Sequence, residues 1–250
     1  MSEIKGKDFD SVFSEVATAL VNQKIFSPRG LATKELINQV LVIENPLDSI
    51  IKNPHRILSV DYIKHEFDWY MSGDLTIEKI QDHASMWKTL LNPDGYTVNS
   101  NYGYYVFKQE VNGKNQFDWV VDSLKKDESS RQAIINFNQP KHKFDKNKDF
   151  VCTINNQFLI RDNELISLVN MRSCDLIYGA SYDIPWFAYV HYRVFKALKN
   201  TYPELQIGRL EHTSASLHIY EKHFKMLADI VNDTEIYESD NLLQIMPQIT

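Results

Sequence analysis

Cys152 and Arg172 are the two residues whose types and spacing most directly indicate chemistry. A cysteine thiolate is a nucleophile, and a neighbouring guanidinium stabilises it and binds anionic groups through a planar fork of donors. A cysteine in a strand is nevertheless more often a small buried hydrophobic residue than a nucleophile. Cys174, the second cysteine, has the weaker claim to a catalytic role. Catalysis therefore depends on the elements that bring Cys152 and Arg172 together.

Residues 150–173 predict a β-hairpin that carries both side chains. In the sequence FVCTINNQFLIRDNELISLVNMRS two apolar runs flank a turn at residues 162–163, which is typical of two antiparallel strands. Regular pairing from that turn places Cys152 opposite Ser173. Strict alternation then puts Arg172 on the other face from Ser173, so bringing Arg172 to Cys152 requires a bulge or a twist.

Hydrophobic periodicity and capping residues predict the elements around the hairpin. Residues 93–105 are rich in turn formers and predict a loop. The expected helices and strands are a helix over 8–23, a strand over 35–44, a helix capped by Ser59 and stopped by Gly73, a strand over 132–138, the hairpin, a helix that starts after Asp183 and a last helix from about Ser216. Helices and strands are therefore both expected.

Several polar residues in these elements have ordinary structural interpretations. Asp183 is first of all a helix N-cap, and Glu66 is first of all a solvent-facing helix residue. His218 and His223 are five positions apart, which suits one helical metal face poorly, so no metal site is expected. The lysine-rich segment 140–149 predicts an exposed loop.

Composition sets broad limits on the protein. The 250 residues are 43% hydrophobic and 24% charged, which is ordinary for a globular chain, and one domain over 1–250 is expected. No apolar run reaches the roughly 18 residues that span a bilayer. Two cysteines and no signal-peptide pattern favour a reducing cytoplasm. The net charge of -6 argues against nucleic acid as a partner, so an anionic ligand would need a local pocket.

Six sequence blocks in family order resemble the thymidylate synthase superfamily, and within it most closely the phage deoxycytidylate hydroxymethylases. The blocks are EFDWYM around Glu66, SNYG at 100–103, SSRQAIINF from Ser129, KDFVCTINNQFLIRD across Cys152, LVNMRSCDLIYGASYDIPW from Leu168 and SLHIYEKHF from Ser216. The resemblance implies an α/β fold with one mixed β-sheet flanked by helices, a homodimer and a phage origin, and hence the cytoplasm of a host.

The resemblance also implies a reaction. In this family the residue at Cys152 adds to C6 of the pyrimidine of a nucleoside monophosphate, which turns C5 into a nucleophile towards the one-carbon unit of 5,10-methylenetetrahydrofolate. Arg172, followed by Ser173, matches the arginine that binds the nucleotide phosphate, to which a guanidinium is well suited. Arg131 matches an arginine that reaches the phosphate site of the partner subunit.

Further residues match family positions. Their implied roles are contact with the sugar 3′-hydroxyl for His218 and Tyr220, organisation of proton transfer and water for Glu66 and Tyr102, and contact with the folate for Asp175 and Trp87, whose ordinary interpretation is a core residue. The folate would act as a cosubstrate.

Three departures from the thymidylate synthase pattern bear on substrate and product. Gln132 stands in place of a second phosphate-binding arginine, so Arg29, one residue from an early family arginine, or a lysine in 141–148 would have to restore the charge. Thr153 follows the nucleophile where thymidylate synthases have histidine, and the tail QIMPQIT differs from their closing tail. The last two departures weaken the case for methyl transfer by hydride.

Asp183 stands where thymidylate synthases carry an asparagine that pairs with uracil. An aspartate accepts from the 4-amino group of cytosine and shares a proton with N3, whereas an ionised carboxylate repels uracil O4. Asp183 therefore favours dCMP, converted to 5-hydroxymethyl-dCMP with release of tetrahydrofolate. One alternative is a dUMP hydroxymethylase or methyltransferase, which Asp183 disfavours. Another is a catalytically silent nucleotide- or RNA-binding relative, which the retained Cys152, Glu66 and Arg172 disfavour.

Overall fold

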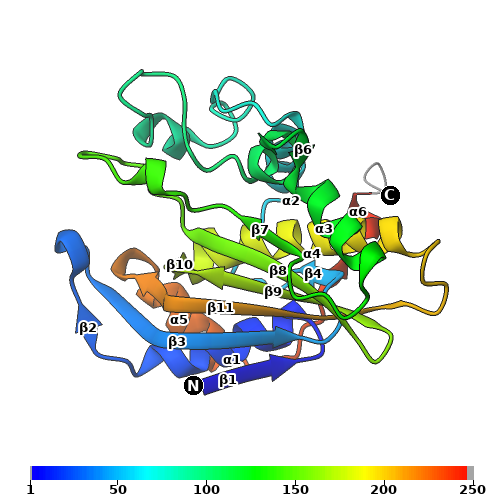
Figure 1. Ribbon diagram of the computed structural model, residues 1–250. Helices are drawn as coiled ribbons and strands as arrows, with labels where there is room; N and C mark the ends of the chain where they lie inside the picture. Colours follow the sequence, from blue (N-terminus) through cyan, green and yellow to red (C-terminus); the bar gives the residue numbers. More distant parts are fainter. Residues whose placement is uncertain (1, 247–250) are drawn as a thin grey trace.

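The computed structural model describes residues 2–246, and a mixed eight-stranded sheet lies at the centre of the fold. Its main path runs β1-β3-β11-β9-β8-β7, from the lower to the upper edge in Figure 1, with β2 beside β3 and β10 beside β11. The strands are β1 Ser2–Gly6, β2 Ile25–Phe26, β3 Thr33–Ile43, β7 Ile134–Asn136, β8 Thr153–Arg161, β9 Glu164–Met171, β10 Cys174–Asp175 and β11 Gln206–Tyr220. Both parallel and antiparallel pairs occur, which confirms the predicted mixed sheet.

The remaining elements surround this sheet. The helices are α1 Phe9–Val21, α2 Val60–Ser72, α3 Gln116–Lys126, α4 Ser181–Leu198, α5 Phe224–Asn232 and α6 Leu242–Ile245. Small strand pairs join β4 Asp48–Ile50 to β12 Asp240–Asn241, and β5 Glu110–Val111 to β6 Lys114–Asn115. Helix α1 packs on β1, β3 and α5, whereas α4 packs on β9, β11 and α3.

The two faces of the sheet differ in burial. His212, Val169 and Asn156 are paired across β11, β9 and β8, and all three are buried. Their neighbours on the opposite face are only half-buried, because residues alternate between the faces along each strand. We call these half-buried residues the open face: Asn155, Gln157, Leu168, Asn170, Glu211 and Thr213. The helices thus cover one face of these three strands.

Local signals define the predicted N-terminal elements well. Asp8 accepts a hydrogen bond from the backbone N–H of Ser11 and caps α1, and Ser59 caps α2 in the same way. Gly73 ends α2 with a φ of 64°, in the left-handed region that favours glycine. The helices predicted over 8–23 and after Ser59 are confirmed, and so is the strand predicted over 35–44.

Strands β8 and β9 form the predicted hairpin. Asp162 and Asn163 have φ values of 52° and 62°, as a two-residue turn with left-handed backbone requires. From this turn the strands pair regularly as far as Asn155 with Asn170. The sequence therefore contains the turn and most of the register.

A bulge near the far end of the hairpin changes the predicted partner of the cysteine. The register shifts between Thr153 and Asn155, and beyond it the Arg172 N–H donates to the Cys152 carbonyl over 2.9 Å. The prediction that Cys152 lies opposite Ser173 was wrong by one residue. Because β8 contains one extra residue here, Cys152 and Arg172 lie side by side.

Two predictions about the second half of the chain were wrong. Helix α4 begins at Ser181, directly after a π-helical segment at Leu176–Ala180, so Asp183 lies inside its first turn and is not its N-cap. Ser216 lies in β11, between β3 and β10, instead of starting a helix. The periodicity of two in β11 belongs to a strand, and the following helix α5 starts at Phe224.

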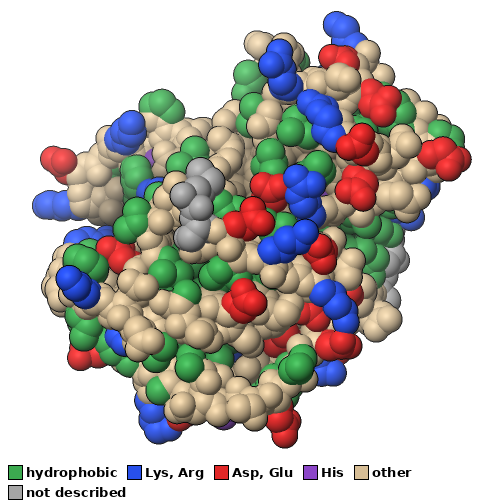
Figure 2. Space-filling view, turned by 90° about the horizontal axis from the view of Figure 1, so that it is seen from below, with side chains coloured by type: hydrophobic (Ala, Val, Ile, Leu, Met, Phe, Trp, Pro, Cys, Tyr) green, Lys and Arg blue, Asp and Glu red, His purple; other side chains and the backbone are tan. Residues whose placement is uncertain are grey.

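The surface shows no concentration of one charge in the view of Figure 2, where acidic and basic side chains are interspersed. The segment 140–149 is mostly exposed, as predicted, although His142 and Asp149 within it are buried. Within residues 2–246, none of the helices has the length and apolar character needed to cross a membrane.

Candidate active site

Arg172 is held against the nucleophile candidate Cys152. Its Nη2 lies 3.4 Å from the Cys152 Sγ, and its Nε donates to the Val151 carbonyl over 3.3 Å. Nη2 also donates to the Phe150 carbonyl, and the guanidinium lies 4.8 Å from the centre of the Phe150 ring. These contacts fix the arginine beside the end of β8. The bulge in β8 thus places Arg172 beside Cys152, which strict alternation along the two strands would prevent.

The Cys152 thiol is protonated at neutral pH in the ligand-free protein. Burial raises its pKa to about 11, the positive charges of Arg172 and Arg29 oppose this shift, and the carboxylates of Asp183 and Asp149 reinforce it. Attack by sulfur therefore requires that the thiol proton leave as the carbon–sulfur bond forms.

Arg29, His218 and Tyr220 gather near the same pair. Arg29 is exposed, lies in the turn Pro28–Gly30 with a φ of 54°, and its positive charge acts on both Cys152 and Tyr220. His218 and Tyr220 share one face of β11, and their ring centres are 5.0 Å apart. The structure therefore groups the residues that sequence comparison relates to phosphate and sugar.

Asp175 pairs with His218 in the sheet and also caps the π-helical segment Leu176–Ala180. Its carboxylate accepts from the backbone N–H groups of Ile177 at 2.7 Å and Tyr178 at 3.3 Å. π-Helical segments often lie at functional sites. Here the segment connects the strand that carries Asp175 to the helix that carries Asp183.

Glu66 is a buried carboxyl, so its interpretation as a solvent-facing residue was wrong. Its side chain projects from α2 and is 5% exposed, and its Oε1 accepts a hydrogen bond of 2.7 Å from the Tyr62 hydroxyl. Burial raises the pKa of Glu66 to about 7, although hydrogen bonds from Tyr62 and Tyr70 act in the opposite direction. Near neutral pH this group can therefore both accept and donate a proton.

Asp183 is a second carboxyl with a raised pKa. Burial and the negative charge of Glu66 raise the pKa of Asp183 well above its usual range. A methyl group added at Gly179 would lie 3.5 Å from the Asp183 Oδ2, so the π-helical segment passes close to this oxygen. Its negative charge would act on Cys152, Tyr70 and Tyr102, which places Asp183 within the site.

Asp149 was not predicted from the sequence, yet it fixes the loop that carries Tyr102. Its buried carboxylate accepts from the backbone N–H groups of Asn99 at 2.5 Å and Ser100 at 2.7 Å, and from the Ser100 hydroxyl. Tyr102 is buried and stacks on Tyr70 with ring centres 5.6 Å apart. The strand of the cysteine and the tyrosine loop are therefore tied together.

An aromatic pocket of about 410 Å³ opens beside α2 and the π-helical segment. It is lined by Ser59, Tyr62, His83, Ala84, Ser85, Met86, Tyr178, Tyr182 and Lys222. Trp87 is not one of the lining residues but contacts one of them. It is 5% exposed, packs on Trp69, and its indole N–H donates to the Tyr62 hydroxyl over 3.2 Å. Three tyrosines and a lysine offer stacking surface and one positive charge.

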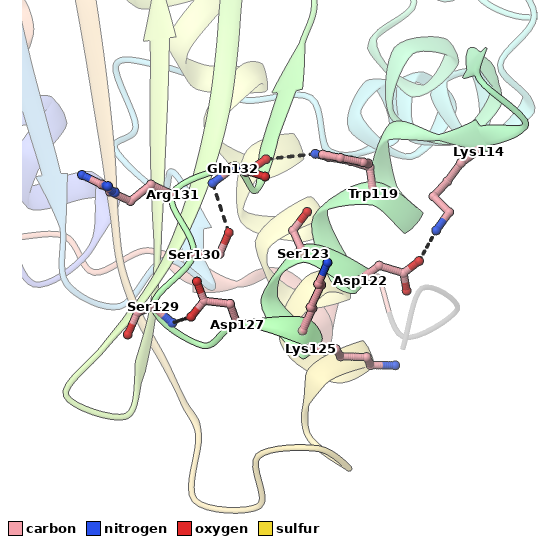
Figure 3. A pocket seen from close by; sticks show the side chains of 11 residues that line it. Lys114, Trp119, Asp122, Ser123, Lys125, Asp127, Ser129, Ser130, Arg131 and Gln132 are labelled. Atoms are coloured by element: carbon pink, nitrogen blue, oxygen red, sulfur yellow. Dashed lines mark hydrogen bonds and ion pairs between the residues drawn. The ribbon is translucent and has the colours of Figure 1, made fainter.

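Arg131 borders a wide cleft that Cys152 does not line. The cleft lies between α3 and the start of β7 and is also lined by Trp119, Lys125 and Ser129. In Figure 3 the side chain of Arg131 extends away from Trp119 and Lys114. Gln132, its neighbour, accepts from the Trp119 indole through its carbonyl. The structure thus brings together the other predicted substrate residues but leaves Arg131 apart from them.

The comparisons with known proteins identify the family. The thymidylate synthase family matches residues 52–246. The chain belongs to the thymidylate synthase family. It is 31% identical to the deoxycytidylate 5-hydroxymethyltransferase of Enterobacteria phage T6 over 79% of this chain and 80% of that protein, and 30% identical to that of phage T2 over 84% and 86%.

More distant relatives lie in the same family. The thymidylate synthase of Buchnera aphidicola is 25% identical over 65% of this chain and 61% of that protein. The thermostable thymidylate synthase A from Bacillus subtilis has the same fold, with a TM-score of 0.69 and 19% identity over 92% of this chain and 86% of that chain. The fold implied by the sequence blocks is therefore confirmed.

Within residues 2–246, no three histidine, cysteine or acidic side chains are grouped as metal ligands. His218 lies in β11 and His223 in a 3₁₀ turn, so the two histidines do not share a helix.

Proposed function

We propose that this protein is a deoxycytidylate 5-hydroxymethyltransferase that uses 5,10-methylenetetrahydrofolate as cosubstrate. Family membership and the phage relatives support one-carbon transfer to a nucleotide. The single observation that carries the choice of dCMP is the buried carboxyl of Asp183, whose charge acts on Cys152 and Tyr102 and which faces Glu66. Asp183 occupies the position that reads the base in the family.

The proposed base selection follows from a carboxyl group, instead of an amide, at position 183. The carboxyl oxygens of Asp183 share a proton with cytosine N3 and accept from its 4-amino group. Uracil N3 already carries a hydrogen and has no lone pair with which to share that proton, and an ionised Asp183 repels uracil O4. A mismatched edge leaves buried polar groups unpaired, which costs roughly 1 to 3 kcal/mol per group. The site is thus expected to prefer cytosine.

Each step of the proposed reaction uses a group in the site. Cys152 Sγ adds to C6, and C5 then forms a bond to the methylene carbon that the folate supplies. C5 then loses its hydrogen as a proton, and tetrahydrofolate leaves with a proton on its nitrogen, which generates an exocyclic methylene on the nucleotide. The oxygen of water adds to this methylene, and Glu66 takes the proton from that water. The C6–sulfur bond then breaks, which regenerates Cys152 and yields 5-hydroxymethyl-dCMP. Tyr102 and Asp183 hold the ring for these proton transfers.

Nucleotide binding is proposed for the cluster around Arg172. Arg172 and Ser173 are adjacent to Cys152, and Arg29 adds a second positive charge that reaches Cys152 and Tyr220. A phosphate is well matched to guanidinium groups. Arg29 thereby offers the charge that Gln132 does not supply. His218 and Tyr220 would contact the sugar.

The aromatic pocket fits the folate. Its tyrosines, with Met86, can stack on a flat heterocycle, and Lys222 can bind a carboxylate tail. Asp175 lies at the start of the π-helical segment, which contributes Tyr178 to the pocket wall. Trp87 would influence the folate site indirectly, through its hydrogen bond to Tyr62. The folate would supply the one-carbon unit and leave without donating hydride.

A homodimer is proposed from the open face and from Arg131. The open face presents half-buried Leu168 among amides and threonine on strands that the helices leave uncovered. Arg131 is exposed and borders a cleft that Cys152 of its own chain does not line. An isologous dimer would let each Arg131 complete the phosphate site of the other subunit.

Product analysis tests the proposal. The protein is incubated with methylenetetrahydrofolate and either dCMP or dUMP, and the nucleotide and the spent folate are analysed by mass spectrometry. We expect 5-hydroxymethyl-dCMP with tetrahydrofolate. Dihydrofolate would indicate methylation, a preference for dUMP would overturn the assigned base, and no product from either nucleotide would support a silent relative.

Matched cysteine variants complete this test. Cys152→Ser should bind dCMP but give no product, because a serine hydroxyl has a far higher pKa than a thiol. Cys174→Ser, which changes the buried second cysteine, should remain active. Normal turnover by Cys152→Ser would show that the nucleophile is another residue.

A further inference from the structure

Tyr62 lies between the aromatic pocket and the carboxyl of Glu66. Its ring lines the pocket, and its hydroxyl donates to Glu66 Oε1 over 2.7 Å. The Tyr62 hydroxyl oxygen also accepts a hydrogen bond from the Trp87 indole N–H over 3.2 Å. One hydroxyl therefore uses both its donor and its acceptor capacity to join two side chains that the reaction proposed above requires.

The local fold explains this geometry. Tyr62 and Glu66 are four residues apart on α2, so they lie one above the other on the same side of the helix. The Tyr62 ring packs edge-to-face on Tyr182, with ring centres 4.8 Å apart, which limits the rotation of the phenol. Trp87 is itself locked against Trp69 in the core.

We propose that Tyr62 is a positioning residue that holds Glu66 Oε1 and thereby orients the carboxyl that takes the proton from water during hydration of the exocyclic methylene. This inference rests on the proposed function. It assigns to Tyr62 a role in product formation that is separate from any contact between its ring and the folate. The proton moves from water to the Glu66 carboxylate, and the water oxygen bonds to the methylene carbon.

The charges around Glu66 define the expected direction of the effect. The titratable groups that face it are Tyr62 and Tyr70 from α2 and Asp183 from α4. The hydrogen bond from Tyr62 favours the ionised carboxylate, so it holds the pKa of Glu66 below the value that burial alone would produce. Removing this hydroxyl should make Glu66 a base only at higher pH.

The test compares Tyr62→Phe with Tyr182→Phe, which removes a hydroxyl from the neighbouring ring. In Tyr62→Phe the limb of the kcat profile that rises with pH should move up by about one pH unit, a loss of roughly 10-fold on the acid side that recovers in alkali. Tyr182→Phe should keep the wild-type limb, whatever its rate. Trp87→Phe should move the limb in the same direction by less, because the indole polarises the Tyr62 hydroxyl.

A measurement without substrate separates this inference from the proposed function. The carboxyl stretch of Glu66, assigned by its absence in Glu66→Gln, is titrated by infrared difference spectroscopy of the ligand-free protein. A higher midpoint in Tyr62→Phe than in wild type is expected. Equal midpoints, or equal shifts in Tyr62→Phe and Tyr182→Phe, would overturn the role of Tyr62. Failure of the wild type to convert either nucleotide would instead overturn the reaction.

Discussion

Glu66 and Asp183 are carboxyl groups that the fold holds in their protonated forms more readily than water does. In both cases burial is the main cause, and Glu66 adds a negative charge next to Asp183. A protein that buries such groups loses free energy of folding when they ionise. Burial of Glu66 and Asp183 therefore lowers the free energy of unfolding, and the proposed reaction uses both groups.

The pH dependence of stability should reveal Glu66. Its pKa in the folded protein is about 7 against 4.5 as the ordinary value. Its contribution to stability is therefore fully present below about pH 4.5 and is lost as the pH rises through 7. Relative to Glu66→Gln, the wild type should lose on the order of 3 kcal/mol between pH 4 and pH 8. Urea unfolding of both proteins across this range measures the difference, and parallel curves would contradict the prediction.

Substitution of Asp183 should change the preferred base. Asp183 makes no capping bond in α4, so Asp183→Asn removes no cap. The amide offers a donor to uracil O4 and an acceptor to N3-H. Unlike a carboxyl group, it cannot transfer a proton to cytosine N3. The ratio of kcat/KM for dUMP to that for dCMP should rise on the order of 10- to 100-fold. Kinetics with both nucleotides under saturating folate measure this ratio, and an unchanged ratio in a folded variant would remove Asp183 from base selection.

At the scale of elements, the site depends on close contacts between segments that are distant in the sequence. Asp149, three residues before Cys152, ties the loop at Asn99 and Ser100 to the start of β8. The same loop passes so close to the end of α2 that only a glycine fits at position 103. Tyr102 is thereby fixed from two sides.

Gly103→Ala should disturb both stability and the position of Tyr102. A Cβ at this residue would lie 1.7 Å from the carbonyl oxygen of Tyr70, which is backbone and cannot rotate away. We expect a loss of about 3 kcal/mol or more in urea unfolding, and reduced turnover. Gly95→Ala is the control, because no atom lies within 4 Å of its Cβ; its φ of 82° should cost only about 1 kcal/mol. Equal losses in the two variants would show that the loop can move.

At the scale of the whole molecule, we expect the proposed phosphate site to need a second subunit. Arg172 and Arg29 act on Cys152, whereas Arg131 borders a cleft that Cys152 does not line, and the helices leave the open face uncovered. Because the chain has a net charge of -6, an arginine contributed by a second subunit would strengthen the binding of an anionic substrate.

Mixed dimers test whether the site is shared. Arg131→Ala and Cys152→Ala should each be nearly inactive alone. After unfolding and refolding together in equal amounts, statistical mixing should restore about a quarter of wild-type activity, because one site of each heterodimer keeps both residues. Activity assays combined with separation of tagged heterodimers check this. Heterodimers without activity would assign Arg131 to its own subunit or to no site.

The sequence by itself determined the elements whose signals are local. The helix capped by Asp8, the helix between Ser59 and Gly73, and the hairpin turn at 162–163 each depend on a few neighbouring residues, and all of them formed as predicted. The six sequence blocks in family order were likewise sufficient to identify the family. Such signals survive in any context because backbone geometry and capping act within one or two turns.

Only the tertiary structure decided the neighbours, the burial and the pKa values of the site residues. The bulge that places Arg172 beside Cys152, the burial of Glu66 and the anchoring by Asp149 all arise from contacts between distant segments. The assignment of Ser216 to a central strand instead of a helix has the same origin, because β3 and β10 provide the pairing. Register, burial and pKa depend on what packs against a residue, and that neighbourhood exists only once the chain has folded.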